Sequence, residues 1–501
     1  MVKAAADVHL NLVGGGWVAG ADGRTFDDES PAQRGSVVGR FQASSVADVK
    51  SAAIAAEAAF PGWRDTALRD RQEAASRLLA LLHAEREALA RIVAVENGKT
   101  IRESRSEVDS ALVEGNYHLQ QASRLFGHGL PAGTRGMTGW VQFHPLGVVA
   151  VICPWNFPVN VLCRKALPAL LTGNTVVFKP ASFTPWSGIF LADLFTRAGF
   201  PAGTFNCVTG AGGDLGDALV EEPRVRAISF TGSTEVGKRI STRAAAGLKR
   251  TQLELGGKNA LIVMDDADLD AAAAAAVTAG YACAGQWCTS TSRVLVQAGV
   301  ARRFLDLLAA RCESLRLGNP LDESTDMGPV AGPSQFARIT DAIALAARQG
   351  ARLITGGAPG GGAVGAGVGA ARLPDGYFIR PTLFADVTPS MNLFQEEVFG
   401  PVLAATAFST LEEALQIANN SVYGLSSAIF TRDLKAALTY VDGIDAGIAH
   451  VNIHSGFKEP SLPFGGWKSS GFGLPENDAT GLEFFVNRKA VYMAGGTGGR
   501  A

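Results

Sequence analysis

The stretch GVVAVICPWNFP, residues 147–158, joins an apolar run to a turn held by two prolines. Similar short runs follow it, with segments of helical length between them: NTVVFKP (174–180), FNCV (205–208) and VRAISF (225–230). Each run is apolar on both faces, as expected of a strand that helices cover on both sides. The alternation predicts an α/β fold with a doubly wound, mainly parallel sheet of the nucleotide-binding type. Such a fold does not by itself name a function.

The segments on either side extend this pattern. Residues 45–59, 68–95 and 107–125 have apolar positions at helical spacing and predict helices, after a short pair of N-terminal strands. A second series of strand-like runs predicts a second α/β unit: NALIVMDDADLD (259–270), SRVLVQ (292–297) and GPVLAATAF (400–408). Near the end, EFFVNRKAVYM (483–493) alternates enough to form a strand that could pair with another subunit.

Length and composition restrict the class of protein. A chain of 501 residues is too long for one hydrophobic core, so two or three domains are expected. The net charge is −2 and no basic run carries interleaved aromatics, so nucleic acid is not an expected partner. We find no signal peptide and no apolar run long enough to span a bilayer, which predicts a cytoplasmic protein without a membrane partner. The six cysteines form no CxxC pair and no histidines lie beside them at metal-ligand spacing, so no metal site is predicted.

Four local patterns have both a chemical and a structural interpretation. The turn TGSTEVG, after a strand and before a helix, could bind phosphate or could be a plain turn. Glu254, beside two glycines in ELGGK, could be a general base or an exposed residue before a turn. Asn156 in PWNFP could donate to an oxyanion or cap a helix. Cys288 in GQWCTS could be a nucleophile or a packed thiol.

Seven blocks in order decide between these interpretations. They are PWNFP (154–158), FKPAS (178–182), SFTGSTEVG (229–237), ELGGK (254–258), GQWC (285–288), EEVFGPV (396–402) and PFGGWKSSG (463–471). In identity and order they resemble the aldehyde dehydrogenase superfamily, and the resemblance covers nearly the whole chain.

The resemblance implies a covalent mechanism. Cys288 would attack the aldehyde carbon, and oxidation of the thiohemiacetal would leave a thioester that water hydrolyses. Asn156 and the backbone N–H of Cys288 would stabilise the oxyanion, and Glu254 would activate the water. Relatives that acylate CoA generally lack this glutamate, so hydrolysis to the free carboxylic acid is favoured.

The resemblance also implies a nicotinamide cofactor. NAD-specific members often carry a glutamate three residues after the lysine of FKPAS, and this chain has Ser182 there. A serine removes the charge that would repel a 2′-phosphate, so both NADP and NAD are expected, and NADP should be accepted. The residues expected to contact the cofactor are Trp155, Lys179, Ser182, Gly232, Ser233, Gly237, Glu397 and Phe399.

The substrate is less clearly indicated. Arg164 matches an arginine that several semialdehyde dehydrogenases use to bind a substrate carboxylate, although it could instead form a structural ion pair. Succinic semialdehyde dehydrogenases add a second arginine six residues before the nucleophile, and here that residue is Ala282. A differently held ω-semialdehyde, of the α-ketoglutaric type, is therefore at least as well supported. His454 and Lys458 are further candidates, beside the expected substrate residues Phe157, Arg164, Trp287, Thr289, Phe457 and Phe464.

Alternatives to a carboxylate-bearing semialdehyde are an aromatic or aliphatic aldehyde and, remotely, a non-catalytic relative. By resemblance we expect a Rossmann-like cofactor domain at 1–128 and 148–256, and an α/β catalytic domain at 257–455. A small β arm at 129–147 and 472–501 would join subunits into a homo-oligomer, a dimer or a tetramer.

Overall fold

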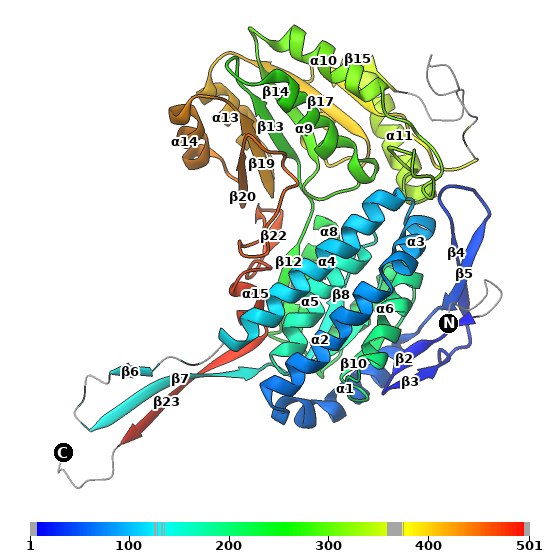
Figure 1. Ribbon diagram of the computed structural model, residues 1–501, viewed down its shortest axis with the longest axis vertical. Helices are drawn as coiled ribbons and strands as arrows, with labels where there is room; N and C mark the ends of the chain where they lie inside the picture. Colours follow the sequence, from blue (N-terminus) through cyan, green and yellow to red (C-terminus); the bar gives the residue numbers. More distant parts are fainter. Residues whose placement is uncertain are drawn as a thin grey trace.

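The computed structural model describes residues 8–124, 127, 129–131, 134, 136–357, 373 and 375–494. Two large sheets, each flanked by helices, lie one above the other, and a narrow β ribbon projects from the lower one (Figure 1). The predicted α/β architecture with mainly parallel sheets is confirmed.

The lower sheet has eight strands, and its centre is parallel. In spatial order it runs β22 (Gly471–Phe472), β12 (Arg250–Glu254), β11 (Val225–Thr231), β8 (Val148–Ile152), β9 (Thr175–Lys179), β10 (Phe205–Cys207), β2 (Asn11–Val13) and β3 (Gly16–Val18). The strands from β12 to β10 are parallel, whereas β22, β2 and β3 pair antiparallel to their neighbours.

Both faces of this sheet are covered, because successive strand residues point to opposite sides. In β8, Val149 and Val151 belong to one apolar core, and Val148, Ala150 and Ile152 belong to another. The first core packs against α2 (Leu68–Ala84), α3 (Arg86–Asn97), α4 (Ile101–Gln121), α5 (Pro158–Leu171) and α6 (Pro185–Arg197). The second packs against α1 (Val46–Asp65), α7 (Gly212–Glu221) and α8 (Thr234–Ala246).

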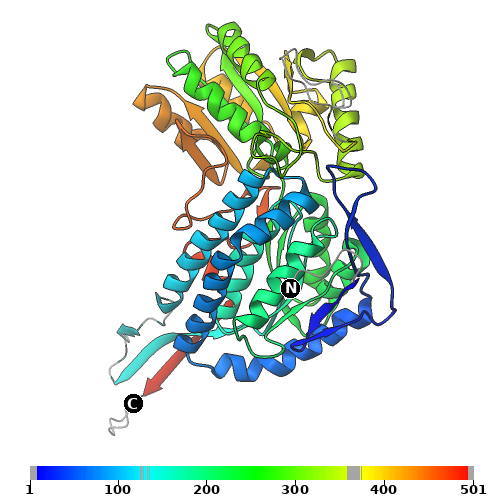
Figure 2. The ribbon, with the colours of Figure 1, turned by 45° about the vertical axis from the view of Figure 1, so that its right-hand side comes forward.

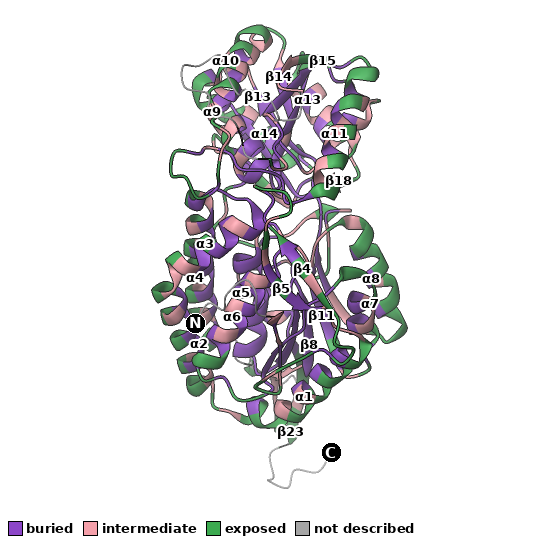
Figure 3. Ribbon diagram, turned by 90° about the vertical axis from the view of Figure 1, so that its right-hand side faces the viewer, coloured by how far each residue is buried: buried purple, intermediate pink, exposed green. Residues whose placement is uncertain are grey.

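Helices α2, α3 and α4 run side by side on one face of the sheet (Figure 2). The apolar pattern over 68–95 predicts one helix, but the chain forms two, which meet at Glu85. The spacing of apolar residues continues through the break, so the pattern alone could not reveal it. Burial follows the layers, with buried strands inside and exposed outer helix surfaces (Figure 3).

The upper sheet has seven strands, all parallel except at one edge. Its order is β15 (Arg352–Thr355), β16 (Thr382–Ala385), β17 (Val402–Phe408), β14 (Thr291–Gln297), β13 (Asn259–Val263), β19 (Ser426–Phe430) and β20 (Ile448–Val451). Only β15 and β16 pair antiparallel. The helices of this unit are α9 (Leu269–Tyr281), η2 (Ala282–Gly285), α10 (Ala301–Glu313), α11 (Pro333–Arg348), α12 (Asn392–Gln395), α13 (Leu411–Asn419) and α14 (Leu434–Gly443).

The ribbon pairs two distant segments of the chain. β7 (Met137–Pro145) pairs antiparallel with β23 (Val486–Ala494) along their whole length, and β6 (Gly129–Pro131) adds a third strand. Residues 495–501 of the predicted arm lie outside the described residues. The remaining elements are β1 (Val8–His9), β4 (Thr25–Glu29), β5 (Val37–Gln42), η1 (Ala122–Arg124), β18 (Tyr423–Gly424), β21 (Trp467–Lys468) and α15 (Thr480–Glu483). In the described part of the chain, no helix combines the length and apolar character that crossing a membrane requires.

Candidate active site

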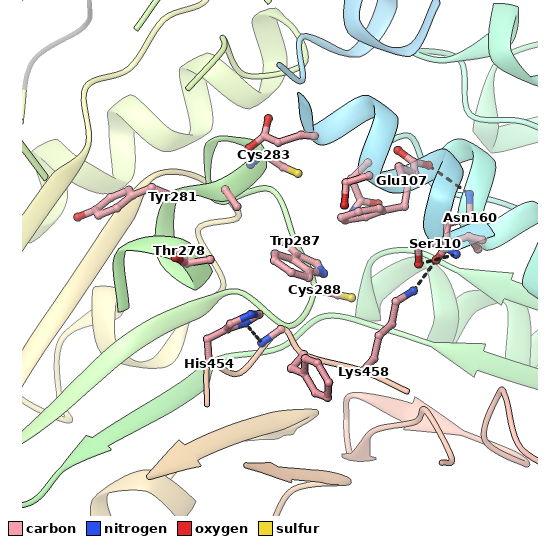
Figure 4. A pocket seen from close by; sticks show the side chains of 18 of the residues that line it. Glu107, Ser110, Asn160, Thr278, Tyr281, Cys283, Trp287, Cys288, His454 and Lys458 are labelled. Carbon is pink, nitrogen blue, oxygen red and sulfur yellow. Dashed lines mark hydrogen bonds between the residues drawn. The ribbon is translucent and has the colours of Figure 1, made fainter. Parts of the chain in front are cut away.

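A cavity of about 690 Å³ lies where the two sheets meet, and Asn156, Glu254 and Cys288 all line it (Figure 4). Asn156 follows β8 and Glu254 ends β12, so both lie at the carboxyl edge of the lower sheet. Cys288 precedes β14, at the amino edge of the upper sheet. Residues far apart in the sequence therefore come together because the carboxyl edge of one parallel sheet faces the amino edge of the other.

The nucleophile candidate follows a tight left-handed turn. Cys283, Ala284 and Gly285 have φ angles of 52°, 54° and 71°. Left-handed backbone costs a residue with a Cβ roughly 1–2 kcal/mol, so the surrounding structure must hold this turn in place. Two contacts do so, because Cys283 N donates to Glu103 at 2.7 Å and Asn259 Nδ2 donates to the carbonyl of Cys288 at 2.8 Å.

Cys288 differs from the other cysteines in exposure. It is partly exposed, whereas Cys153, Cys163, Cys207, Cys283 and Cys312 are buried. Burial of its thiol still raises the pKa of Cys288 to about 12, although Arg164 nearby acts in the opposite direction. The thiol is therefore protonated at neutral pH, and a base must take its proton before it can act as a nucleophile.

Asn156 is fixed beside the nucleophile turn. Its Nδ2 donates to the carbonyl of Gln286 at 3.0 Å, and the side chain is buried. A carboxamide has two N–H groups, so one bond fixes the amide and leaves a second donor. The position satisfies what an oxyanion donor requires, namely a rigid N–H beside the reacting group.

Glu254 is a buried carboxyl group at the same cavity. Burial, and next the negative charge of Glu476, raise the pKa of Glu254 well above its ordinary value, while Lys165 and Arg164 act the other way. Its Oε2 atom has no hydrogen-bond partner among the described residues. In its ionised form, a carboxylate with a raised pKa and an unpaired oxygen is a stronger base toward a thiol or a water.

Arg164, the candidate for binding a substrate carboxylate, is already engaged by acidic side chains. Its Nε and Nη2 donate to Glu114 at 2.8 and 2.9 Å, and Nη2 also donates to Asn160 at 2.8 Å. Nη1 reaches Glu476 at 3.3 Å, and the ring of Phe464 lies 4.5 Å from the guanidinium. The side chain lines the cavity but is only 5% exposed.

The predicted aromatic residues mostly line this cavity. Phe157, Trp287, Phe457 and Phe464 do so, and the rings of Phe157 and Trp287 lie 5.7 Å apart. Thr289 is buried and is not among the described residues that line the cavity.

Some charged residues of this site were not predicted. Glu476, in the segment before α15, lines the cavity and pairs with Arg164 and Lys165. Glu114, on α4, pairs with Arg164 and Lys458. No local motif distinguishes them from surface glutamates. Only the packing of α4 against α5 and the return of the C-terminal segment bring them here.

Residues 17–491 match the aldehyde dehydrogenase family. The chain belongs to this family. It is 37% identical over 487 residues to the alpha-ketoglutaric semialdehyde dehydrogenase of Bacillus subtilis (strain 168), covering 97% of this chain and 98% of that protein. It is 36% identical over 493 residues to the betaine aldehyde dehydrogenase of Rhizobium leguminosarum bv. trifolii (strain WSM2304), covering 97% of each.

A solved structure agrees with this assignment. The NAD-dependent aldehyde dehydrogenase from Sinorhizobium meliloti superposes with a TM-score of 0.94 at 36% identity, covering 99% of this chain and 96% of that one. The protein is thus an aldehyde dehydrogenase that oxidises an aldehyde to an acid with NAD or NADP.

The turn between β11 and α8 of this aldehyde dehydrogenase fits a dinucleotide. Ser233 caps α8, accepting from Val236 N, so the first turn of the helix begins directly after the strand. A Cβ on Gly237 would lie 2.4 Å from the Leu255 side chain, so a larger residue would displace that side chain. Dinucleotides bind at such helix N-termini, at the carboxyl ends of parallel strands.

Four further residues expected to contact the cofactor lie outside this turn. Lys179 ends β9 and is buried, with Nζ donating to the carbonyl of Pro180 at 2.9 Å. Glu397 Oε1 accepts a hydrogen bond at 2.8 Å from the backbone N–H of Gly257, the second glycine of the ELGGK motif. Phe399 has a φ of 54° and its ring packs edge-on against Trp155 at 5.4 Å.

Proposed function

We propose that this aldehyde dehydrogenase oxidises a carboxylate-bearing semialdehyde to the corresponding dicarboxylic acid. The observation that carries the proposal is that two cations, Arg164 and Lys458, line the cavity, and that Lys165 belongs to the same buried ion-pair network. Positive charge in a largely apolar cavity favours an anionic substrate. The similarity to a semialdehyde dehydrogenase supports the same substrate class.

In the proposed mechanism, Glu254 takes the proton of Cys288, and the thiolate attacks the aldehyde carbon. The second N–H of Asn156 and the backbone N–H of Cys288 stabilise the oxyanion of the thiohemiacetal. Oxidation of that carbon gives a thioester, and water activated by Glu254 releases the acid and the thiol.

When bound, the oxidised nicotinamide supplies the hydride acceptor. Lys179, Ser182, Ser233 and Glu397 would hold the cofactor, with Gly232 and Gly237 shaping the turn and Trp155 and Phe399 beside the nicotinamide end. With a serine at position 182, we propose that both NADP and NAD are used.

The betaine aldehyde dehydrogenase relative raises a different substrate class. Betaine aldehyde is a quaternary ammonium compound, and the buried cations of this cavity would repel it. Aromatic and aliphatic aldehydes lack the charge that would offset these cations, although Phe157 and Trp287 could contact them.

We further propose a homo-oligomer, joined by the arm at 129–147 and 472–501, in the cytoplasm. The cofactor domain would comprise 1–128 and 148–256, and the catalytic domain 257–455.

A side-by-side screen of semialdehydes, betaine aldehyde, aromatic aldehydes and aliphatic aldehydes, each with NAD and with NADP, tests the proposal. Formation of reduced nicotinamide is followed by its absorbance. The highest kcat/KM is expected for a carboxylate-bearing semialdehyde, and a higher value for a neutral or cationic aldehyde would refute the proposed substrate class.

A further inference from the structure

Arg164 and Lys458 both line the cavity, but they differ in how many of their N–H donors are already used in hydrogen bonds within the protein. A guanidinium has five N–H donors, and four of those on Arg164 are directed at Glu114, Asn160 and Glu476. The ring of Phe464 covers one face of the same group. Arg164 therefore has little capacity left to bind a substrate carboxylate.

Lys458 is more exposed to the cavity than Arg164 and keeps a free N–H donor. It lies in the segment between β20 and β21, lines the cavity, and keeps 23% of its side chain exposed, against 5% for Arg164. Its Nζ donates to Glu114 and, at 2.7 Å, to Asn160 Oδ1. An ammonium has three N–H donors, so one remains beyond these two acceptors.

A second donor lies beside it. Ser110 on α4 lines the cavity, and its Oγ accepts from Asn160 Nδ2 at 3.3 Å. No acceptor for the Ser110 hydroxyl hydrogen is found among the described residues, so this O–H can donate into the cavity. The side chains of Lys458, Ser110 and Asn160 converge in Figure 4, where Asn160 bridges the other two.

The charges of the network do not balance. Three cations, Arg164, Lys165 and Lys458, share two carboxylates, Glu114 and Glu476, through direct ion pairs. The direct ion pairs thus hold one more cation than carboxylates. Ionised Glu254 acts on Lys165 and Arg164, so Lys458 is the cation with which a ligand carboxylate would pair.

We propose that Lys458, with Ser110, binds the carboxylate of the substrate, and that Glu114, Asn160 and Arg164 position the Lys458 ammonium. The inference rests on the proposed carboxylate-bearing substrate and names the residues that select it. Arg164 is then a positioning residue rather than a binding residue.

The protonation of Lys458 gives the site a pH dependence. Burial, and next the charge of Arg164, lower the pKa of Lys458 to about 8, while Glu114 and the Cys288 thiol act in the opposite direction. Below that pH the ammonium is charged and binds an anion, and above it the neutral amine does not.

The test compares glutarate semialdehyde with its methyl ester, which keeps the carbon chain and removes the charge. The quantity measured is the ratio of kcat/KM for the acid to kcat/KM for the ester. This ratio cancels the contributions of Cys288 and Glu254, which act on both substrates. In Lys458→Met we expect the ratio to fall roughly 10–100-fold, mainly through KM, because a charge-assisted hydrogen bond is lost.

Lys458→Arg should recover much of the ratio, and Ser110→Ala should lower it by a smaller factor. The matched control is Lys50→Met, at an exposed position on α1, which should keep the wild-type ratio. For the wild-type protein, the ratio should fall as pH rises through about 8, a readout that needs no variant to fold.

The possible failures are distinguishable. If the wild-type protein does not prefer the acid to the ester, the proposed substrate class is wrong. If the wild-type protein prefers the acid and Lys458→Met keeps that preference, the proposed function stands and the role of Lys458 is overturned. If Lys458→Met does not fold, the wild-type protein still gives a test. A ratio of kcat/KM for the acid to kcat/KM for the ester that stays constant through pH 8 would overturn the role of Lys458.

Discussion

Desolvation raises the pKa values of both the Glu254 carboxyl and the Cys288 thiol, and in the proposed mechanism each group requires the other. The thiol remains protonated until a base takes its proton, and the base must itself be ionised to do so. The positive charges of Arg164 and Lys165 favour the ionised glutamate, and Arg164 also favours the thiolate. The network that we assign to substrate binding thus also supports the reacting groups.

Glu254→Gln removes the base but keeps the shape of the side chain. We expect steady-state turnover to fall by roughly 10²–10⁴-fold, because no group then takes the proton of Cys288 or activates the water. Formation of reduced nicotinamide, followed by its absorbance, measures the change. In the wild-type protein, turnover should fall as pH is lowered through the raised pKa of Glu254, since protonation removes the base. Unchanged steady-state turnover in Glu254→Gln would show that Glu254 is not the base.

At the residue scale, the ordered motifs predicted which catalytic side chains line one cavity, but not their surroundings. Asn156, Glu254 and Cys288 were all identified from short blocks, and all three line the cavity. Arg164 was left between a substrate role and a structural ion pair. The acids that occupy it, Glu114 and Glu476, lie 50 and 312 residues away in the sequence, so no local pattern could decide.

Among the elements, the segment between β12 and β13 packs directly against the backbone of Cys288. Gly257 packs so tightly that a Cβ there would lie 2.7 Å from the carbonyl oxygen of Cys288. The same carbonyl accepts from Asn259. The glycine is thus required by close approach, beyond any freedom it gives to Glu254.

Gly257→Ala should therefore displace the nucleophile segment. We expect kcat to fall at least about tenfold, because misplacing the reacting group by a fraction of an ångström to 1 Å lowers the rate by up to about 10²-fold. The control is Gly62→Ala in α1, where an added Cβ meets nothing within 4 Å. Steady-state kinetics compares the two variants, and equal activity would mean that the Cys288 segment accommodates the methyl group.

The sequence predicted whether most segments are helices or strands more accurately than it predicted where those elements begin and end. Strand runs near 148, 175, 205 and 225 became β8, β9, β10 and β11 because apolar residues on both faces fit a doubly covered sheet. The break between α2 and α3 was missed, since the helical period continues across Glu85.

At the scale of the whole molecule, the Arg164 network joins three parts of the chain. It connects α4 through Glu114, α5 through Arg164 and Lys165, and the C-terminal segment through Glu476. Breaking an ion pair this deeply buried destabilises the fold, because removing one partner leaves a buried charge unpaired.

Arg164→Met should lower the free energy of unfolding by about 3–5 kcal/mol, because Glu114 and Glu476 lose a buried partner. Denaturant unfolding followed by circular dichroism measures the change. Arg69→Met, which breaks an exposed pair with Glu73, is the control and should cost far less. Equal stability of the two variants would contradict a structural role for Arg164.

Cys288, in the cavity between the two sheets, is the proposed nucleophile of this aldehyde dehydrogenase. The most direct measurement is formation of reduced nicotinamide by Cys288→Ala, supplied with NAD or NADP and a carboxylate-bearing semialdehyde that the wild-type protein oxidises. Cys283→Ala, which removes a buried cysteine of the preceding turn, is the matched control. We expect no turnover in Cys288→Ala and retained turnover in Cys283→Ala, whereas continued turnover in Cys288→Ala would contradict a nucleophilic role for Cys288.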